Sequence, residues 1–166
     1  MKFVVKRMSA AIVLALAVGA LSPVTTASAG GDCWRYKDSE REFAQKINAA
    51  RDAVGANRLE IDRELSKVAR RHAWEMDSKN SLYHTPSDKL RWRVTRWNRL
   101  GENVGAGQTV LSLHRAFMNS PSHRSNVLDR DFRHLGVGVH RDQNYIWVTM
   151  VFESRRDPGT RLRMCR

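Results

Sequence analysis

The chain has 166 residues and a formal net charge of +12, from 29 lysines and arginines against 17 aspartates and glutamates. This length is enough for one domain with a real hydrophobic core, and it argues against a chain of several domains. A basic surface favours anionic partners, such as wall polymers, anionic lipid headgroups and extracellular nucleic acid. Charge alone identifies no ligand.

Residues 1–29 are typical of a secretory signal peptide. Three basic residues lie among the first seven, an apolar run extends from Ala10 to Leu21, and an A-x-A pattern ends at Ala29. The run is shorter than the roughly 20 residues that span a bilayer, and no second apolar segment follows it. We therefore expect cleavage after Ala29, a secreted protein without a transmembrane segment, and one mature domain over residues 30–166.

The chain has two cysteines, Cys33 and Cys165, near the two ends of that domain. Because disulfides persist outside the cell, we expect one intramolecular bridge and a monomer. The bridge would close nearly the whole domain into a loop, for which the chain-entropy model allows up to roughly 4–5 kcal/mol. The signal peptide carries three of the 29 basic residues and none of the 17 acidic ones, so its removal lowers the net charge from +12 to +9.

Helix signals come first along the domain. The sequence Ser39-x-x-Glu42 resembles a capping box ahead of an apolar helical face that Gly55 can end. Asp62 can cap a second helix, which carries His72 on its apolar stripe. A polar stretch that contains tryptophan and arginine follows this second helix.

Two further helices and two strands complete the pattern. Thr109 can cap a third helix, and Pro121 suits the first position of a short fourth one. The segments 135–139 and 145–152 predict two strands joined by a short hairpin, so this pair is antiparallel. The second segment is apolar on both faces, which requires helices above and below it.

Glycines in two places predict close packing. Gly136 and Gly138 alternate with apolar residues, which indicates that another element lies very near that strand's backbone. The glycine-rich run 101–107 lacks the ending of a phosphate loop, and it predicts tight turns and close packing. The whole pattern predicts an α+β fold, a three-layer α-β-α sandwich around a small, mainly antiparallel sheet.

An ordered set of motifs resembles a bacterial domain of the CAP superfamily, also called SCP, which holds cysteine-rich secretory and pathogenesis-related proteins. The resemblance covers about residues 40–153, and its fold is an α-β-α sandwich. Each motif is weak alone, and the ordered set is strong. The motifs are A-x-x-H-A-x-x-M at 69–76, Tyr83-His84, L-G-E-N-V-G at 100–105, S-P-S-H-R-S-N-V-L at 120–128 and L-G-V-G-V at 135–139.

The resemblance implies a cleft, where family members often hold two histidines and two glutamates. Here His84, Glu102 and His123 match three of these positions, whereas Ser120 replaces the second glutamate and Met150 replaces a glutamine often seen in the final strand. Two imidazoles and a carboxylate suit zinc or a similar divalent metal, with open positions for water. The other interpretation is a set of hydrogen bonds around the cleft.

Three more side chains are expected beside the cleft. His72 lies on an apolar stripe, so we interpret it as a buried packing residue, with a position facing the cleft as the alternative. Asn103 is expected to hold the turn into the glycine-rich run. Ser120 is expected to cap the helix that follows it.

Basic side chains offer candidate contacts for polyanions: Arg91, Arg93, Arg96, Arg99 and Arg124. Because the arginines of the chain are scattered apart from the first four of these, we favour the alternative, a solvated basic face. Trp92 and Trp97 lie among the first four of them. These tryptophans either stack on a ligand or anchor a long loop onto the core.

Three functions stay open. The first, which we favour, is a secreted binding module whose cleft takes an extracellular ligand or a divalent metal. The second is a metal-assisted hydrolase of peptide or phosphodiester bonds, with His84 and His123 as ligands and Glu102 as ligand or base. One carboxylate cannot easily do both jobs, and no catalytic residue is assigned. The third is a basic protein that binds anionic wall polymers, lipids or nucleic acid.

Overall fold

The computed structural model describes residues 33–142, 145–155 and 159–165, which belong to one compact unit spanning residues 31–166. The expected signal peptide and its cleavage site lie outside the described residues. Within the described part of the chain, no helix is long and apolar enough to cross a membrane.

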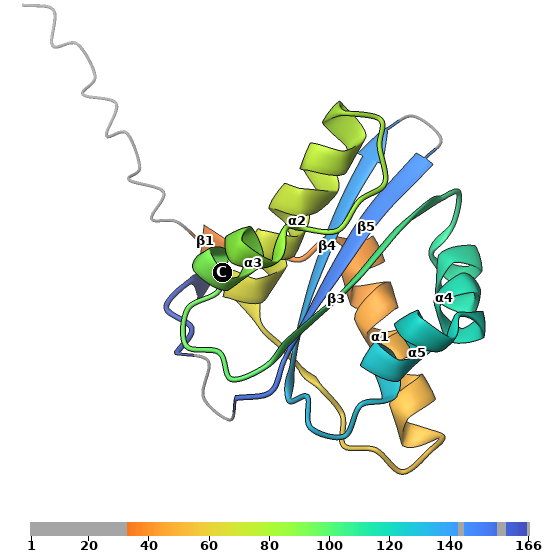
Figure 1. Ribbon diagram of the computed structural model, residues 1–166, viewed down its shortest axis with the longest axis vertical. Coiled ribbons are helices and arrows are strands. Elements are labelled where there is room, and N and C mark those ends of the chain that lie inside the picture. The colour runs from red at the N-terminus through yellow and green to blue at the C-terminus, as the bar shows by residue number, and fades with distance from the viewer. Residues whose placement is uncertain (1–32, 143–144, 156–158, 166) are drawn as a thin grey trace, which may run out of the picture. The chain divides into compact units, whose positions relative to one another are not determined.

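A four-stranded sheet in the order β2-β4-β5-β3 forms the centre of the fold (Figure 1). The strands β3 (Leu100–Gly107) and β4 (His134–Asp142) both pair antiparallel with β5 (Tyr145–Glu153), which lies between them. The short strand β2 (Glu60–Ile61) pairs with β4 in parallel. The expected hairpin and the mainly antiparallel sheet are therefore confirmed.

The ends of the domain are joined to each other. The strands β1 (Cys33–Trp34) and β6 (Arg163–Met164) form a separate, parallel two-stranded pair. Beside this pair, Cys33 and Cys165 form a disulfide, as the sequence predicted.

Helices cover both faces of the sheet (Figure 1). One face packs against α1 (Asp38–Asp52), α4 (Val110–Asn119) and α5 (Pro121–Leu128) through the main apolar core. The other face packs against α2 (Arg63–Ser78) and α3 (Ser87–Arg93) through two smaller apolar clusters. The predicted three-layer α+β sandwich is confirmed.

The starts of α2 and α4 follow their predicted caps, whereas the start of α1 does not. The side chain of Asp62 accepts from the Leu65 amide at 2.8 Å, and Thr109 accepts from the Ser112 amide at 3.0 Å. Both predicted caps are therefore confirmed, and Gly55 adopts the left-handed φ of 64° just beyond α1.

The capping box predicted at Ser39 and Glu42 is wrong, because α1 begins earlier, at Asp38. Glu40 makes the reciprocal contact instead, since its carboxylate accepts from the backbone amide of Lys37 at 2.9 Å. Glu40 is 1% exposed and also accepts two hydrogen bonds from the Arg70 guanidinium. A buried ion pair, rather than a solvated cap, therefore fixes the start of this helix.

The glycines act as predicted in β4 and differently in β3. A Cβ on Gly138 would lie 1.9 Å from the Arg70 amide nitrogen, and one on Gly136 would lie 2.3 Å from the Leu65 carbonyl carbon. The backbone of α2 therefore lies directly on β4. The run 101–107 forms no turns but an eight-residue edge strand, whose alternate glycines receive side chains from α4 and from the chain beyond α5.

Candidate functional site

A histidine and a glutamate pair at the edge of the sheet. His84 lies in the loop between α2 and α3, and Glu102 lies in the edge strand β3. Oε1 of Glu102 is 2.9 Å from Nδ1 of His84 and accepts from the backbone amide of Thr85 at 2.8 Å. Because a carboxylate only accepts, Nδ1 carries the proton, and Nε2 of a neutral His84 is left as an acceptor.

The second oxygen of Glu102 differs from the first. The side chain is 5% exposed, and within the described residues its buried Oε2 has no hydrogen-bond partner. A buried carboxylate oxygen without a donor is costly, by about 1–3 kcal/mol or more for a charged group. A hydrogen-bond donor that reached this oxygen would therefore stabilise the site.

The pair lines a pocket of about 450 Å³ between α3 and the start of β3. His84 is the more exposed member of the pair, with a side chain 59% exposed. The other lining residues come from the loop before α3, from α3, from the loop that follows it and from the start of β3: Thr85, Ser87, Leu90, Arg91, Trp97, Asn98, Arg99, Leu100 and Gly101. The sequence singled out Arg91, Arg99 and Trp97 for a basic surface and not for this pocket, because α3 has only one buried apolar residue and gave no helical periodicity.

His72 is buried, as the sequence favoured, and supports the site from behind. It is fully buried, its Nε2 donates to the carbonyl of Tyr83 at 2.8 Å, and the two rings meet edge to face. Its Nδ1 lies 3.4 Å from a carboxylate oxygen of Glu75. His72 thus holds the residue that precedes His84 and does not itself line the pocket.

His123 belongs to the other side of the edge strand. It lies in α5, where its ring packs edge to face on Phe117 and its backbone carbonyl accepts from Nδ2 of Asn103 at 2.9 Å. Burial lowers the pKa of His123, and the charge of His84 lowers it further.

The residues do not fit a three-ligand metal centre. Zinc in a catalytic site takes three protein ligands and leaves one position open. Among the described residues, no group of three or more His, Cys, Asp or Glu side chains is arranged to hold a metal ion. Nδ1 of His84 and Oε1 of Glu102 are already hydrogen-bonded to each other. In the described part of the chain, His123 makes neither a hydrogen bond nor an ion pair with Glu102.

Asn103 and Ser120 differ from their expected roles. Asn103 lies within β3 rather than at a turn, is fully buried, and joins β3 to α5 by donating to His123 and accepting from Nδ2 of Asn126. Ser120 occupies the N-cap position of α5, but its hydroxyl lies 3.2 Å from that of Ser122 and caps no amide. The asparagines, and not the serine, therefore position α5 beside the site.

Three of the predicted basic residues contact other residues of the protein. Arg93 is not a surface contact, because its side chain is 9% exposed and donates to Glu75. Arg99 pairs with Asp129, and the side chain of Arg96 lies against Gly159.

Arg91 and Arg124 remain available to contact a ligand. Trp92 and Trp97 differ in their exposure and contacts. Arg124 is exposed, and Arg91 has no acidic partner in the described residues and lies over the ring of Trp97. Trp97 anchors the loop, since its indole donates to the Arg91 carbonyl at 3.2 Å. Trp92 is 81% exposed.

The fold and the site define a class: a disulfide-tied α-β-α sandwich with a His–Glu pair at the edge strand. The family model for CAP, the cysteine-rich secretory protein family, matches residues 44–152, and the chain belongs to this family. The predicted resemblance is therefore confirmed.

Relatives and solved structures agree with this assignment. The chain is 35% identical over 131 residues to the uncharacterized protein YkwD of Bacillus subtilis, covering 75% of this chain and 49% of the relative. It resembles an extracellular SCP-domain protein of Bacillus anthracis (TM-score 0.64, 25% identity, 70% of this chain and 40% of that one). It shares its fold with an outer surface protein of Borrelia burgdorferi (TM-score 0.65, 22% identity, 74% and 97%). The chain thus spans about half the length of YkwD.

Proposed function

We propose that this protein is an exported binding module whose pocket beside His84 and Glu102 takes a small extracellular ligand. The observation that carries the proposal is the buried Oε2 of Glu102, which has no hydrogen-bond partner among the described residues and belongs to a residue that lines a 450 Å³ pocket. Export is supported by the signal-peptide pattern of residues 1–29, by the disulfide, and by the extracellular and outer-surface descriptions of the similar structures.

The chemistry of the pocket describes the ligand. Oε2 of Glu102 requires a donor, such as an ammonium or hydroxyl group. Arg91 offers a cation without an acidic partner in the described residues, and guanidinium groups bind phosphate or carboxylate with two parallel hydrogen bonds. A ligand with a hydrogen-bond donor and an anionic group therefore fits this pocket.

Two matched probes test this account. Phosphoethanolamine carries an anion and N–H donors, whereas phosphocholine carries the same charges without the donors. In calorimetry on the refolded mature protein, phosphoethanolamine should bind more tightly, and Glu102→Gln should weaken it by about tenfold or more. Equal binding of the two probes, or no binding of either, would contradict the proposed ligand chemistry.

Zinc titration separates this account from the metal site. The double variant His84→Ala, His123→Ala removes both imidazoles while leaving Glu102 in place. If zinc bound wild type one-to-one and lost affinity in this variant, the metal-binding interpretation would replace ours. The hydrolase alternative has less support than the binding module, because the described residues do not assemble its ligand set.

A second candidate function is attachment to anionic polymers, which the exposure of Trp92 favours. Trp92 is 81% exposed in α3 between Arg91 and the paired Arg93. Exposed aromatic and cationic side chains together suit a polyanionic strand. Trp92→Ala should weaken binding to a polyphosphate without changing phosphoethanolamine binding, and binding should fall with salt. Salt-independent binding would argue against this role.

A further inference from the structure

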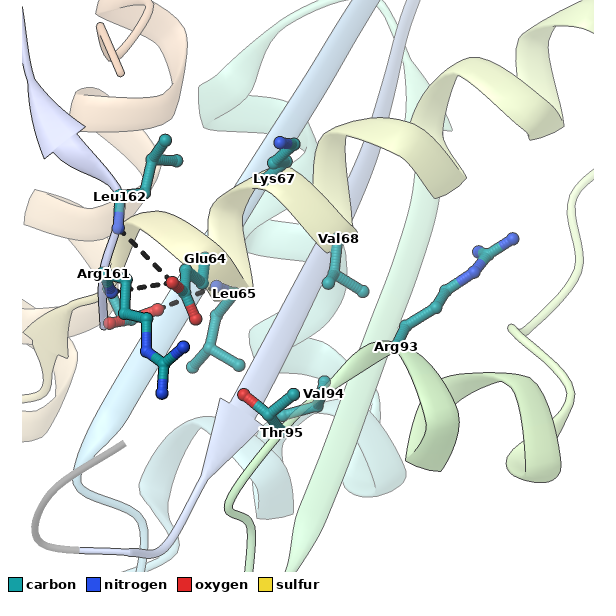
Figure 2. A pocket seen from close by; sticks show the side chains of 10 residues that line it. Glu64, Leu65, Lys67, Val68, Arg93, Val94, Thr95, Arg161 and Leu162 are labelled. Atoms are coloured by element: carbon teal, nitrogen blue, oxygen red, sulfur yellow. Dashed lines mark hydrogen bonds between the residues drawn. The ribbon is translucent and has the colours of Figure 1, made fainter. Parts of the chain in front are cut away.

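The C-terminal segment of the domain lies against the start of α2 and forms one wall of a second pocket there. This pocket has a volume of about 390 Å³, and side chains of α2 and of the chain around the end of α3 form its other walls (Figure 2). Glu64 accepts from the backbone amides of Arg161 and Leu162 at 2.7 and 3.3 Å (Figure 2). The segment then reaches Cys165, which forms the disulfide with Cys33. These contacts bring the disulfide close to α2.

The disulfide itself lies in the wall of a third pocket, which we call the disulfide pocket. Its volume is about 340 Å³. The residues that line it are Cys33, Trp34, Arg35, Lys67, Arg70, Leu162 and Cys165. Cys33 is exposed, and Cys165 is half-buried. A small molecule in this pocket therefore lies against the sulfur–sulfur bridge.

The charged side chains that line the disulfide pocket are all cationic. They are Arg35, Lys67 and Arg70, and no aspartate or glutamate lines the pocket among the described residues. The buried Glu40 binds Arg70 by two hydrogen bonds and compensates its charge. Arg35 and Lys67 are exposed, and neither forms an ion pair with an acidic side chain in the described part of the chain. The pocket therefore holds uncompensated positive charge beside the disulfide.

The second pocket differs from the disulfide pocket in its charge. Asp62 and Glu64 line the second pocket, so its acidic and basic side chains are mixed. The disulfide has a further cation close to it, because the exposed Arg163 is the register partner of Cys33 between β6 and β1. The acidic residue next to Cys33 in the sequence is Asp32, which lies outside the described residues. Positive charge thus predominates around the bridge in the part of the chain that the structure describes.

We propose that the Cys33–Cys165 disulfide is a site of thiol–disulfide exchange with small anionic thiols, and that Cys33 is the cysteine that becomes thiolated. The thiolate attacks Sγ of Cys33 and forms a new sulfur–sulfur bond, while the old bond breaks and its electron pair leaves on Sγ of Cys165. A second thiolate then attacks the outer sulfur of this mixed disulfide and releases Cys33. Two thiols are oxidised to one small disulfide, and their two protons end on the two cysteines.

The positive charge assists both ends of the first step. It raises the local concentration of an anionic thiol, and it stabilises the thiolate that leaves on Cys165. Cys33 is the residue attacked because it is the more exposed of the two, and access to the sulfur governs the rate of exchange. The strands β1 and β6 pair over only two residues, so the released Cys165 can separate from the mixed disulfide.

Two thiols with the same carbon chain and opposite charge test the electrostatic part. Mercaptoethanesulfonate carries a sulfonate, and cysteamine carries an ammonium group. Each rate constant for the mature oxidised protein, expressed per thiolate, is divided by that of the same thiolate with hydroxyethyl disulfide, a neutral reference. At low salt this ratio should be about tenfold larger for the sulfonate, and the difference should disappear as salt is added. An equal or larger ratio for cysteamine, or a preference that salt does not change, would overturn the proposal.

Charge variants test whether the preference comes from the disulfide pocket. The double variant Arg35→Glu, Lys67→Glu changes only exposed side chains and should abolish the preference for the sulfonate. The matched control Arg115→Glu, Arg124→Glu makes the same change in net charge at exposed positions of α4 and α5, in the other helical layer, and should keep most of the preference. Asp32→Asn should increase it. An equal loss in the control would overturn the assignment to this pocket.

Mass mapping of the mixed disulfide tests which cysteine is attacked. The reaction with mercaptoethanesulfonate is quenched with acid at early times, the free thiol is alkylated, and the two cysteine peptides are analysed. The adduct should lie on Cys33 and the alkyl group on Cys165. An adduct mainly on Cys165 would overturn the assignment of Cys33. In concentrated urea the preference for the sulfonate should vanish, because the cations from α2 no longer lie beside the bridge, and its persistence there would contradict a role for the folded pocket.

Discussion

The two faces of the central sheet meet their helices in different ways. On the side of α1, α4 and α5, long apolar side chains such as Ile146 and Phe152 fill the space completely. On the side of α2, the backbone of the helix lies directly on Gly136 and Gly138. Where the backbone of α2 lies on the glycines, the layer is thin, and its apolar side chains form two small clusters instead of one large core. Residues of α2 or α3 line the first and second pockets. The first face is therefore filled by side chains, and the second face leaves these two pockets at its margins.

The largest expected effect is that of Gly138→Ala, which tests the backbone contact. Its Cβ would lie 1.9 Å from the amide nitrogen of Arg70, and backbone atoms cannot move aside as a flexible side chain does. We expect a loss of more than about 4 kcal/mol, enough to prevent folding of many domains of this size. Urea unfolding followed by circular dichroism would measure it.

Gly107→Ala is the matched control on the other face. There the added Cβ would meet Cδ2 of Leu113 at 3.0 Å, the far end of a flexible side chain. We expect a loss of no more than about 1 kcal/mol. If both variants lost the same stability, the contrast between the two faces would be wrong.

Asn103→Ala tests the polar link between β3 and α5. Asn103 is fully buried, and its removal leaves the carbonyl of His123 and the amide of Asn126 without this partner. An unsatisfied buried group costs about 1–3 kcal/mol, so we expect a loss in that range from chemical unfolding. Asn103→Asp puts a buried carboxylate against the carbonyl of His123, so it should lose at least as much stability as Asn103→Ala. Full stability of Asn103→Ala would show that the link is dispensable.

The dependence of stability on pH tests the contribution of Glu75, in α2. Burial alone would raise the pKa of Glu75, but hydrogen bonds from Arg93, His72 and Arg71 outweigh it and lower this pKa to about 2. The folded pKa is below the unfolded value of 4.5, so the contribution is present above pH 4.5 and is lost as the pH falls toward 2. Because the group is partly exposed, we expect no more than about 1 kcal/mol.

Glu75→Gln should remove this part of the pH dependence. Chemical unfolding between pH 7 and pH 2 would show a smaller loss of stability on acidification than in wild type. Glu60→Gln, an exposed carboxylate in β2, is the control and should leave the profile unchanged. Parallel profiles for wild type and Glu75→Gln would contradict the assignment.

The smallest expected effect is a change in the pKa of His123 when His84, on the other face of the sheet, is replaced. The charge of His84 is the second cause, after burial, of the lowered pKa of His123. His84→Ala should therefore raise the pKa of His123 toward 6.5 in an NMR titration. The pKa of His114 is lowered by burial and by Lys46, so it should stay the same and serves as the control. No change at His123 would mean that the two imidazoles are not coupled.

Most of the fold could be predicted, because local signals determine it. The caps at Asp62 and Thr109, the proline that begins α5 and the hairpin of β4 and β5 all depend on residues within a few positions of one another. The edge strand β3 was missed because its glycines lower the strand propensity of the segment. Glycine is needed there because side chains from other elements pack directly against the strand. The helix α3 was missed because only Leu90 on it is buried.

The site was predictable only in part. His84 and Glu102 are 18 residues apart, and no local pattern joins them, so the family resemblance alone brought them together. It could not show that Oε1 of Glu102 would bond to His84 and leave Oε2 unpartnered. The second pocket had no signal, because the C-terminal segment reaches α2 only in the folded chain.

The disulfide also determines how the domain responds to mechanical force. The Cα atoms of Cys33 and Cys165 are 4.9 Å apart, although 132 positions separate them in the chain. Tension applied outside these residues passes through the sulfur–sulfur bond and not through the sheet. An extended chain spans about 3.5 Å per residue, so the closed disulfide prevents the segment between the two cysteines from extending by roughly 450 Å. A domain built in this way keeps its fold while it is pulled from outside the two cysteines, and it lengthens only after the disulfide is reduced.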